Sequence, residues 1–127
     1  MAMTDYLENA LLKHSTGLEA YTMPTSVKLV LLEDDPGEIG SLTSELSGGG
    51  YARVDITNVL VLSNNKLINN SDILFPTATA DWNLINYFGI VDQDSNLLYY
   101  TAAASAISIT ENETLRIKAN YLSISMD

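Results

Sequence analysis

The first residues of the chain carry apolar side chains at the spacing of a helix. The apolar positions lie three and four residues apart and would share one face: Tyr6, Leu7, Ala10 and Leu11. Thr4 can cap the first turn through its hydroxyl, and Gly17 can adopt the left-handed conformation that ends many helices. The pattern predicts a helix over residues 4–17, within an N-terminal arm that we expect to span residues 1–22.

The apolar face of this helix has two interpretations. It can pack on the sheet of its own domain, which is the simpler interpretation, because amphipathic helices generally turn their apolar side to a core. It can instead dock on a neighbouring subunit. The sequence leaves both open, and the candidate interface residues are Tyr6, Leu7 and Leu11.

Beyond Pro24 the pattern changes to short extended segments. Residues 27–32 are almost continuously apolar and rich in valine and leucine, as a strand buried on both faces would be. Clusters of glycine, asparagine, proline and acidic residues separate this run from further short runs that favour strands. The expected strands cover residues 27–32, 51–62, 73–75, 84–91, 97–101, 106–110, 114–118 and 121–126.

The last two of these segments show the clearest alternation between apolar and polar positions. Leu115 and Ile117 alternate with polar neighbours, and the next segment repeats this with Leu122, Ile124 and Met126. About eight short strands separated by turns are typical of an antiparallel sandwich or a jelly-roll-like domain. We therefore expect a mainly β fold with an N-terminal α-helix, in which residues 23–127 form a single β-sandwich domain.

The negative net charge of the chain argues against two classes of binding partner, nucleic acids and anionic membranes. Its 16 acidic and 6 basic residues give a formal net charge of −10 at pH 7. Basic side chains are too few to neutralise phosphates, so we expect no nucleic-acid partner, and anionic membranes would repel the chain. No apolar run reaches the roughly 18 residues of a spanning helix, so we expect no membrane segment. The chain has no cysteine, which excludes disulfides and thiolate metal sites.

No group of residues in the sequence indicates a catalytic site. His14 is the only histidine, and its place near the end of the expected helix suits a structural role beside the helix dipole. A Ser-His-Asp relay would need a marked serine, such as one in a G-x-S-x-G turn, and the chain has none. We therefore expect no enzyme, no catalytic residue and no cofactor.

Two acidic segments are candidates for calcium sites. Residues 33–38 enclose the dipeptide Pro36-Gly37, which favours a solvated turn over a metal site. Residues 92–96 match the first ligand positions of a calcium-binding loop. Leu97 then stands in place of the required glycine, and Ala103 in place of the glutamate at the twelfth position. Both segments are interpreted as turns, and no metal is expected.

Asp81 and Trp82 suggest two further interpretations. An indole ring beside a carboxylate can form a carbohydrate site, in which the ring stacks on the sugar and the acid binds its hydroxyls. The simpler interpretation is that Trp82 anchors the core while Asp81 binds backbone N–H groups of a turn. The glycine run at residues 48–50 lacks the Lys-Ser/Thr of a phosphate-binding loop and is interpreted as a conformational feature.

Several segments carry a resemblance to a known family. The most specific are residues 47–53 and 75–82, followed by residues 85–92 and 97–100. With the N-terminal helix and the final strands, they resemble small proteins of tailed bacteriophages that are commonly called phage tail fibre proteins. The resemblance implies structural roles for the motif residues Gly48, Gly49, Gly50, Tyr51, Arg53, Phe75, Pro76, Asp81, Trp82, Phe88 and Gly89. Asn112-Glu113 and Asn83 depart from the glycine-containing turns of such relatives, which concerns turn types and not the fold.

The resemblance implies a non-enzymatic virion structural protein. Such a protein would assemble through protein–protein contacts, as a tail or tail-fibre component or as a decoration (cement) protein on the capsid surface. Its partners would be other virion proteins, and we expect a homo-oligomer, with a trimer among the options. The alternative is a carbohydrate- or receptor-binding β-sandwich module of the phage tail, with Trp82, Tyr99 and Tyr100 as its aromatic candidates.

Overall fold

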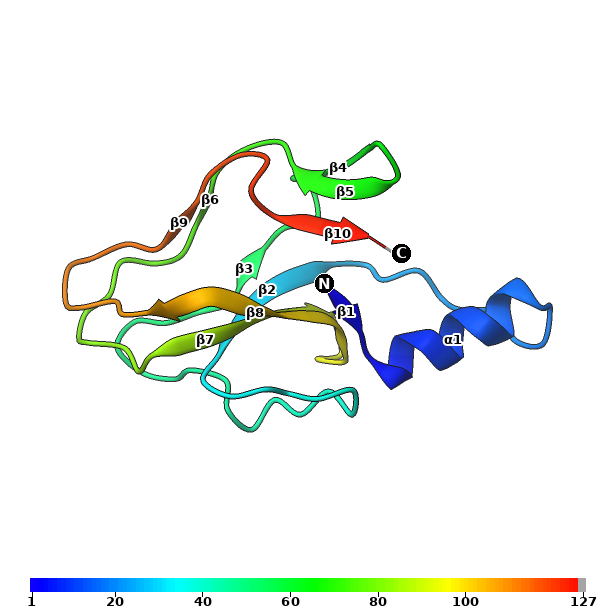
Figure 1. The fold of residues 1–127 in the computed structure, drawn as a ribbon, viewed down its shortest axis with the longest axis horizontal. Coiled ribbons are helices and arrows are strands. Elements are labelled where there is room, and N and C mark those ends of the chain that lie inside the picture. The colour runs from blue at the N-terminus through cyan, green and yellow to red at the C-terminus, as the bar shows by residue number, and fades with distance from the viewer. Residues whose placement is uncertain (126–127) are drawn as a thin grey trace.

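A computed structural model gives the structure of the protein and describes residues 1–125. Its largest element is a five-stranded antiparallel sheet, which crosses the middle of Figure 1. In spatial order, the strands of this main sheet are β1 (Ala2–Met3), β8 (Leu97–Ile107), β7 (Ile85–Asp92), β2 (Val27–Leu32) and β3 (Val54–Asp55). The hairpin of β7 and β8, together with β2, supplies most of its residues.

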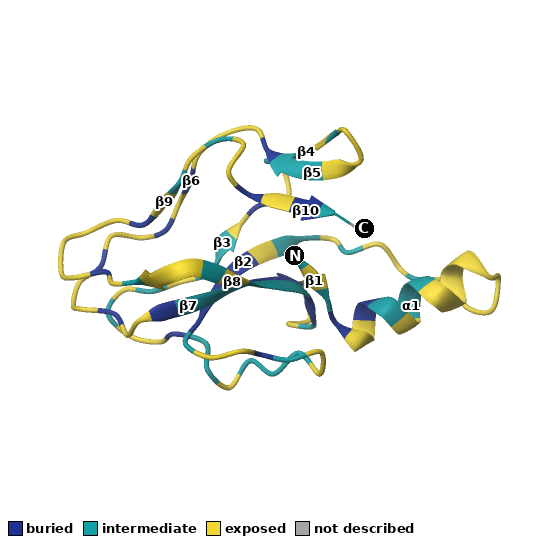
Figure 2. Cartoon of the chain, viewed as in Figure 1, coloured by how far each residue is buried: buried dark blue, intermediate teal, exposed yellow. Residues whose placement is uncertain are grey.

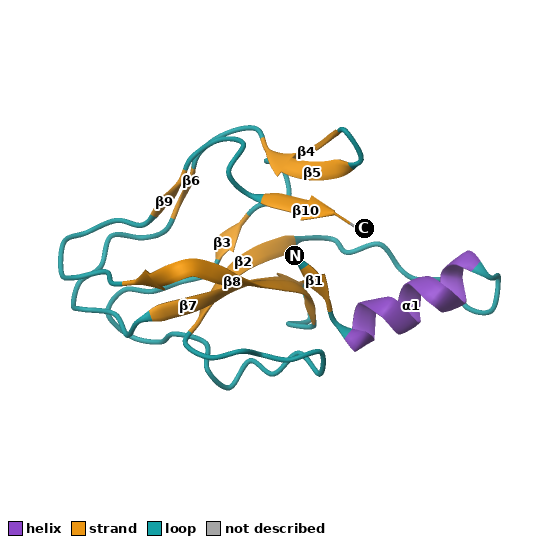
Figure 3. Cartoon of the chain, viewed as in Figure 1, coloured by secondary structure: helices purple, strands orange, loops and turns teal. Residues whose placement is uncertain are grey.

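Two smaller antiparallel sheets lie on one side of the main sheet (Figures 1 and 3). One consists of β10 (Ser123–Ser125), β5 (Lys66–Asn69) and β4 (Leu60–Ser63), and the other pairs β6 (Ile73–Leu74) with β9 (Arg116–Ile117). Apolar side chains of both small sheets share one buried cluster with the main sheet. The prediction of a mainly β, antiparallel, sandwich-like fold with an N-terminal helix is confirmed, and the second layer is divided in two.

Strand β2 is buried on both faces, as its apolar run predicts. Its last four residues alternate between two clusters, and each has an exposed fraction of 0%: Leu29 and Leu31 face the small sheets, and Val30 and Leu32 the opposite side. The loop after β2 covers that opposite side with Leu42, and the N–H of Leu46 donates to the Leu31 carbonyl at 3.0 Å. An ordered loop therefore supplies the cover that a helix or a second sheet usually provides for such a strand.

An aromatic group fixes the end of this loop on the core. Trp82 is 7% exposed, and its indole N–H donates to the Gly49 carbonyl at 2.7 Å. The Tyr51 ring meets the Trp82 ring edge-on at a centroid distance of 5.7 Å and stacks on Phe75 at 6.4 Å. Gly49 has a φ of +59°, and a Cβ there would lie 2.8 Å from Cδ1 of Trp82. This position requires glycine both for its backbone conformation and for the close approach of the ring.

Helix α1 (Asp5–Ser15) differs from its prediction at the N-terminal cap. Thr4 is buried, and its hydroxyl donates to the Leu97 carbonyl instead of accepting from the first turn, so the predicted side-chain cap is wrong. The N–H of Asp5 donates to the carbonyl of Glu38 at 2.9 Å. At the other end Gly17 has a φ of +77°, as predicted for a left-handed cap. Within residues 1–125, no helix is long and apolar enough to span a membrane.

The expected strand over residues 51–62 is wrong, because a turn divides it. The Asp55 carboxylate accepts a hydrogen bond from the N–H of Thr57 at 2.8 Å, and the turn carries the chain from β3 in the main sheet to β4 in a small sheet. The expected strands 97–101 and 106–110 are instead joined in one strand, β8, whose pairing with β7 shifts register along its second half. The sheet arrangement overrides the local strand pattern in the first case and the expected break between strands in the second.

Two strands fall outside the predicted set. Strand β1 has only two residues, too few for a periodic pattern, and it exists because it pairs with Tyr99 and Tyr100 of β8. Strand β5 lies between two asparagine-rich turns, and Asn64 and Asn65 adopt the left-handed conformation that closes the β4–β5 hairpin. Met126, the last apolar position of the predicted final strand, lies outside the described residues.

The contact between Gly49 and Trp82 gives a prediction with an internal control. Gly48→Ala adds a Cβ with nothing within 4 Å at a φ of +74°, so we expect only the conformational cost, about 1 kcal/mol. Gly49→Ala carries the same cost and also displaces the indole ring, so we expect about 2–4 kcal/mol. Urea unfolding of both variants measures the difference, and equal losses would show that the close approach has no energetic role.

Candidate functional site

Helix α1 extends away from the sheets with only its first turn anchored. Thr4 and Leu7 are buried, whereas every residue from Leu12 to Ala20 is exposed. Figure 2 shows this change along the helix, from buried and intermediate residues near the main sheet to exposed residues at the distal end. The helix therefore presents most of its surface to solvent or to another molecule.

The candidate interface residues Tyr6, Leu7 and Leu11 have three different surroundings, although Leu7 and Leu11 lie one turn apart on the same side of the helix. Leu7 is 3% exposed and packs inward on the body. Tyr6, 45% exposed, borders a polar cleft, and Leu11 borders an apolar hollow on another side. Each of the two interpretations of the helix thus fits part of it, and the predicted single apolar stripe is divided.

An apolar patch lies on the outer side of α1. We define it as Met3, Leu11 and Leu12, which border an open hollow of about 470 Å³. Leu12 is 63% exposed, although a leucine side chain contributes roughly 1.5–3 kcal/mol when it is fully buried. Glu8 and Ser15 lie at its rim one helical turn away on either side. Exposed apolar groups with a polar rim are typical of surfaces that bind another protein.

A polar cleft lies on a different side of α1, between the helix, the chain that follows it and the β7–β8 hairpin turn. We define it as Tyr6, Asn9, Tyr21, Thr22, Gln93 and Asp94, and its volume is about 540 Å³. Asn9, Thr22, Gln93 and Asp94 are exposed, and Tyr21 is half-buried. The pKa of Tyr21 is raised by burial and by the nearby Tyr6 and Asp92. The cleft thus combines two phenol rings with amide, hydroxyl and carboxylate groups.

Asp92 holds the hairpin turn that forms one wall of this cleft. It is 5% exposed, and its Oδ1 accepts hydrogen bonds from the N–H groups of Asp94 and Asn96, both at 2.9 Å. Its Oδ2 accepts from the side-chain amide of Asn96 at 3.1 Å. The carboxylate is therefore committed to the turn that the sequence predicts here, in the manner of an aspartate that binds its own following backbone.

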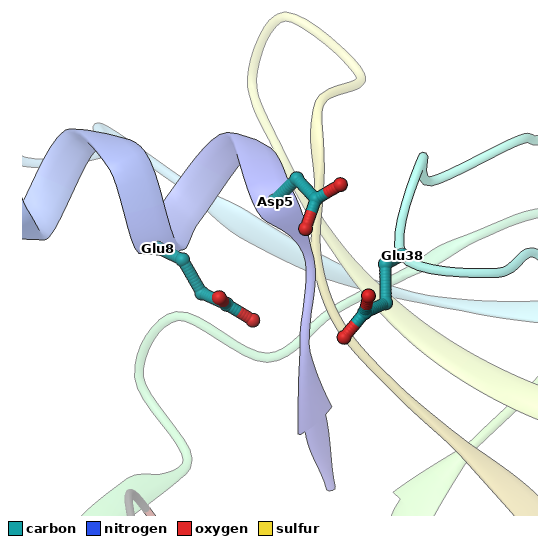
Figure 4. A group of neighbouring side chains, drawn as sticks. All are labelled: Asp5, Glu8 and Glu38. Atoms are coloured by element: carbon teal, nitrogen blue, oxygen red, sulfur yellow. The ribbon is translucent and has the colours of Figure 1, made fainter.

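Three carboxylates approach one another where α1 leaves the body. One oxygen from each of Asp5, Glu8 and Glu38 lies within 4.8 Å of the others, at the surface (Figure 4). Asp5 and Glu8 occupy the first turn of the helix, where the dipole favours negative charge. Of the acidic segment 33–38, only Glu38 belongs to this group, and Asp35 instead accepts from the N–H of Gly37 at 2.8 Å in a turn. Oxygen donors of this kind suit a hard cation.

Arg53 and Glu45 form a structural network beside the main sheet. Arg53 binds Glu45 through two hydrogen bonds, at 2.7 and 2.9 Å, and donates to Ser95 of the hairpin turn at 2.9 Å. The Tyr51 hydroxyl donates to Glu45 at 2.7 Å and accepts from the N–H of Leu31 at 3.2 Å. The network therefore ties the long loop to β2 and to the β7–β8 turn. Glu45 is not among the residues that the sequence predicts for a site. Its only sequence feature is that an acidic residue lies six positions before Tyr51.

Electrostatics keep this network charged. Burial alone would raise the pKa of Glu45, but the hydrogen bonds from Arg53 and Tyr51 outweigh it and hold that pKa below its ordinary value. The same hydrogen bond to Glu45 raises the pKa of Arg53, and burial raises that of Tyr51. A bidentate pair between guanidinium and carboxylate is among the stronger side-chain interactions.

The aromatic residues considered for carbohydrate binding do not form one site. Trp82 packs in the core with Tyr51, so its ring has no free face for a sugar. Asp81 accepts from the N–H of Glu111 at 2.9 Å and ties down a turn. Tyr99 and Tyr100 are half-buried in clusters on opposite faces of the main sheet. Exposed phenol rings lie elsewhere, at Tyr6 and Tyr121.

The other motif residues take varied positions. Phe75 is buried beside Tyr51, and Pro76 follows it on the surface. Phe88 is half-buried in β7. A Cβ on Gly89 would lie 2.6 Å from a methyl group of Leu97, so a larger residue there would displace the buried Leu97 side chain. His14 accepts from the N–H of Tyr21 through Nδ1 at 3.0 Å, which holds the chain after α1 against the helix.

The comparison with family models identifies the protein family of the chain. The model described as Podophage GP4 fiber I protein gp80 matches residues 2–125, which include α1 and all three sheets. The chain belongs to this family. It is therefore a phage tail fibre protein by family, a structural component of the virion that associates with other virion proteins in the tail. No curated protein matches the chain.

Glu45→Gln tests the charged network. At neutral pH we expect the free energy of unfolding to fall by about 1.5–3 kcal/mol, because the amide cannot accept the bidentate bonds of Arg53. The folded-state pKa of Glu45 is depressed, so its contribution is present above its unfolded pKa and is lost as the pH falls through the folded pKa. The difference in the free energy of unfolding between the wild type and Glu45→Gln should therefore disappear at acidic pH.

Urea unfolding over a pH series measures this gap. Glu111→Gln, at an exposed position, is the matched control and should change stability little at any pH. A gap for Glu45→Gln that stays constant into acid would contradict the electrostatic explanation and would leave a loss of packing as the cause.

Proposed function

We propose that this protein is a non-enzymatic structural subunit of a phage tail fibre, which attaches to a neighbouring virion subunit through the apolar patch on α1. The patch carries the proposal. Leu12 is largely exposed on a helix that the body anchors only at its first turn. Family membership supports a tail placement over decoration of the capsid surface. The neighbouring subunit is a second copy in a homo-oligomer, such as a trimer, or another tail protein.

The division of the chain supports this role. We propose an arm of residues 1–22 and a β domain of residues 23–127. The arm is fastened where β1 joins the edge of β8 and the Thr4 hydroxyl binds the Leu97 carbonyl. A helix held at one end can reach a partner without deforming the sheets. The net charge of −10 makes copies of this chain repel one another. Burial of leucine side chains against the partner supplies a favourable free energy of association that offsets this repulsion.

The double change Leu11→Glu with Leu12→Glu tests the proposal. Two carboxylates in the patch would be desolvated on docking, so we expect the variant to be lost from purified phage particles when it replaces the wild-type chain. Its thermal stability should change little, because Leu12 is exposed. Quantitative mass spectrometry of particles measures incorporation, and sedimentation of the free protein shows whether the partner is a second copy.

Leu84→Glu is the matched control. Leu84 is also an exposed leucine, at 52%, but it precedes the end of β7 that pairs with the far end of β8. This variant should be incorporated as the wild type is. If the patch variant enters particles at the wild-type level, the patch is not the attachment surface.

A further inference from the structure

We propose that the polar cleft binds a neutral saccharide. The proposal is independent of the assembly role, because the cleft and the apolar patch lie on different sides of α1 and share no residue. It also places the sugar site away from Trp82, which is buried in the core.

The cleft combines aromatic rings with groups that form hydrogen bonds. A pyranose ring offers apolar C–H groups on its faces and hydroxyls on its edge, so it suits a site that joins aromatic rings to amide and carboxylate groups. Tyr6 and Tyr21 supply the rings here. Within residues 1–125, the side chains of Asn9 and Thr22 make no hydrogen bond and are free to bind hydroxyls.

Hydrogen bonds hold the walls of the cleft in place. Gln93 accepts from the N–H of Thr25 at 3.1 Å and donates to Asp94 Oδ2 at 3.1 Å, which leaves Oδ1 of Asp94 available. Asp92 fixes the backbone of the same turn. On the opposite wall, His14 accepts from the N–H of Tyr21. A site whose walls are fixed before binding loses less entropy when the ligand enters.

The charge and the volume of the cleft suit a small neutral ligand. Lys13 at the rim is paired with Glu19 at 3.3 Å, and Asp94 then adds an uncompensated negative charge. An anionic sugar would be repelled, so a neutral hexose or N-acetylhexosamine is the fitting class. The volume of about 540 Å³ is within the range of small-molecule sites, about 300–1,000 Å³.

The test uses the full-length protein and a panel of neutral sugars: glucose, galactose, mannose, rhamnose, N-acetylglucosamine and N-acetylgalactosamine, with glucuronic acid as the anionic probe. Protein NMR titration should show saturable shift changes confined to α1, residues 19–22 and residues 92–94 for at least one neutral sugar. Glucuronic acid should bind more weakly than glucose. Shift changes elsewhere, or none with any neutral sugar, would overturn the proposal.

Two variants make the assignment specific. Tyr6→Ala removes an exposed ring and Asp94→Asn removes a charge without changing shape, and each should weaken the observed binding by about tenfold or more. Tyr121→Ala, at a 75% exposed tyrosine outside the cleft, is the control and should bind as the wild type does. The patch variant should also retain binding, which separates this proposal from the assembly role. Undiminished binding in Asp94→Asn and Tyr6→Ala would refute the site.

Discussion

The structure depends on the burial of one strand on both faces. Four consecutive apolar residues of β2 are wholly removed from water, two against the small sheets and two against the loop that follows. A loop can cover a strand only if its own polar groups are satisfied. The hydrogen bonds between Glu45, Tyr51 and Arg53, and the indole of Trp82 on Gly49, fix this loop in place.

A body held in this way can carry a projecting arm. After Leu7, no residue of the arm belongs to the buried core, so the exposed surface of the helix is available to a partner. Its sides differ: one presents exposed leucine to the surroundings, and another presents polar groups to the hairpin turn at residues 92–96. A subunit that both attaches to its neighbours and displays a ligand site would use these two sides separately, with the sheets serving as a rigid support.

The sequence predicts the fold better than the sites. The apolar run at residues 27–32, the alternating final strands and the glycine at position 17 carry their structural meaning locally. The break between β3 and β4 does not, because residues 51–62 keep strand-like composition through a turn that only the sheet arrangement requires. The cleft is harder still: Tyr6, Tyr21 and Asp94 are distant in sequence, and no local pattern brings them together. The helical wheel groups Tyr6, Leu7 and Leu11, but the position of the body separates them.

Imaging of the assembled particle tests the central claim most directly. A cryo-electron microscopy map of the phage tail, at a resolution that shows side chains, would reveal what covers α1. We predict that this chain lies in the tail and that Met3, Leu11 and Leu12 are buried against an adjacent subunit. A map in which this chain sits in the tail with those three side chains facing solvent would contradict it.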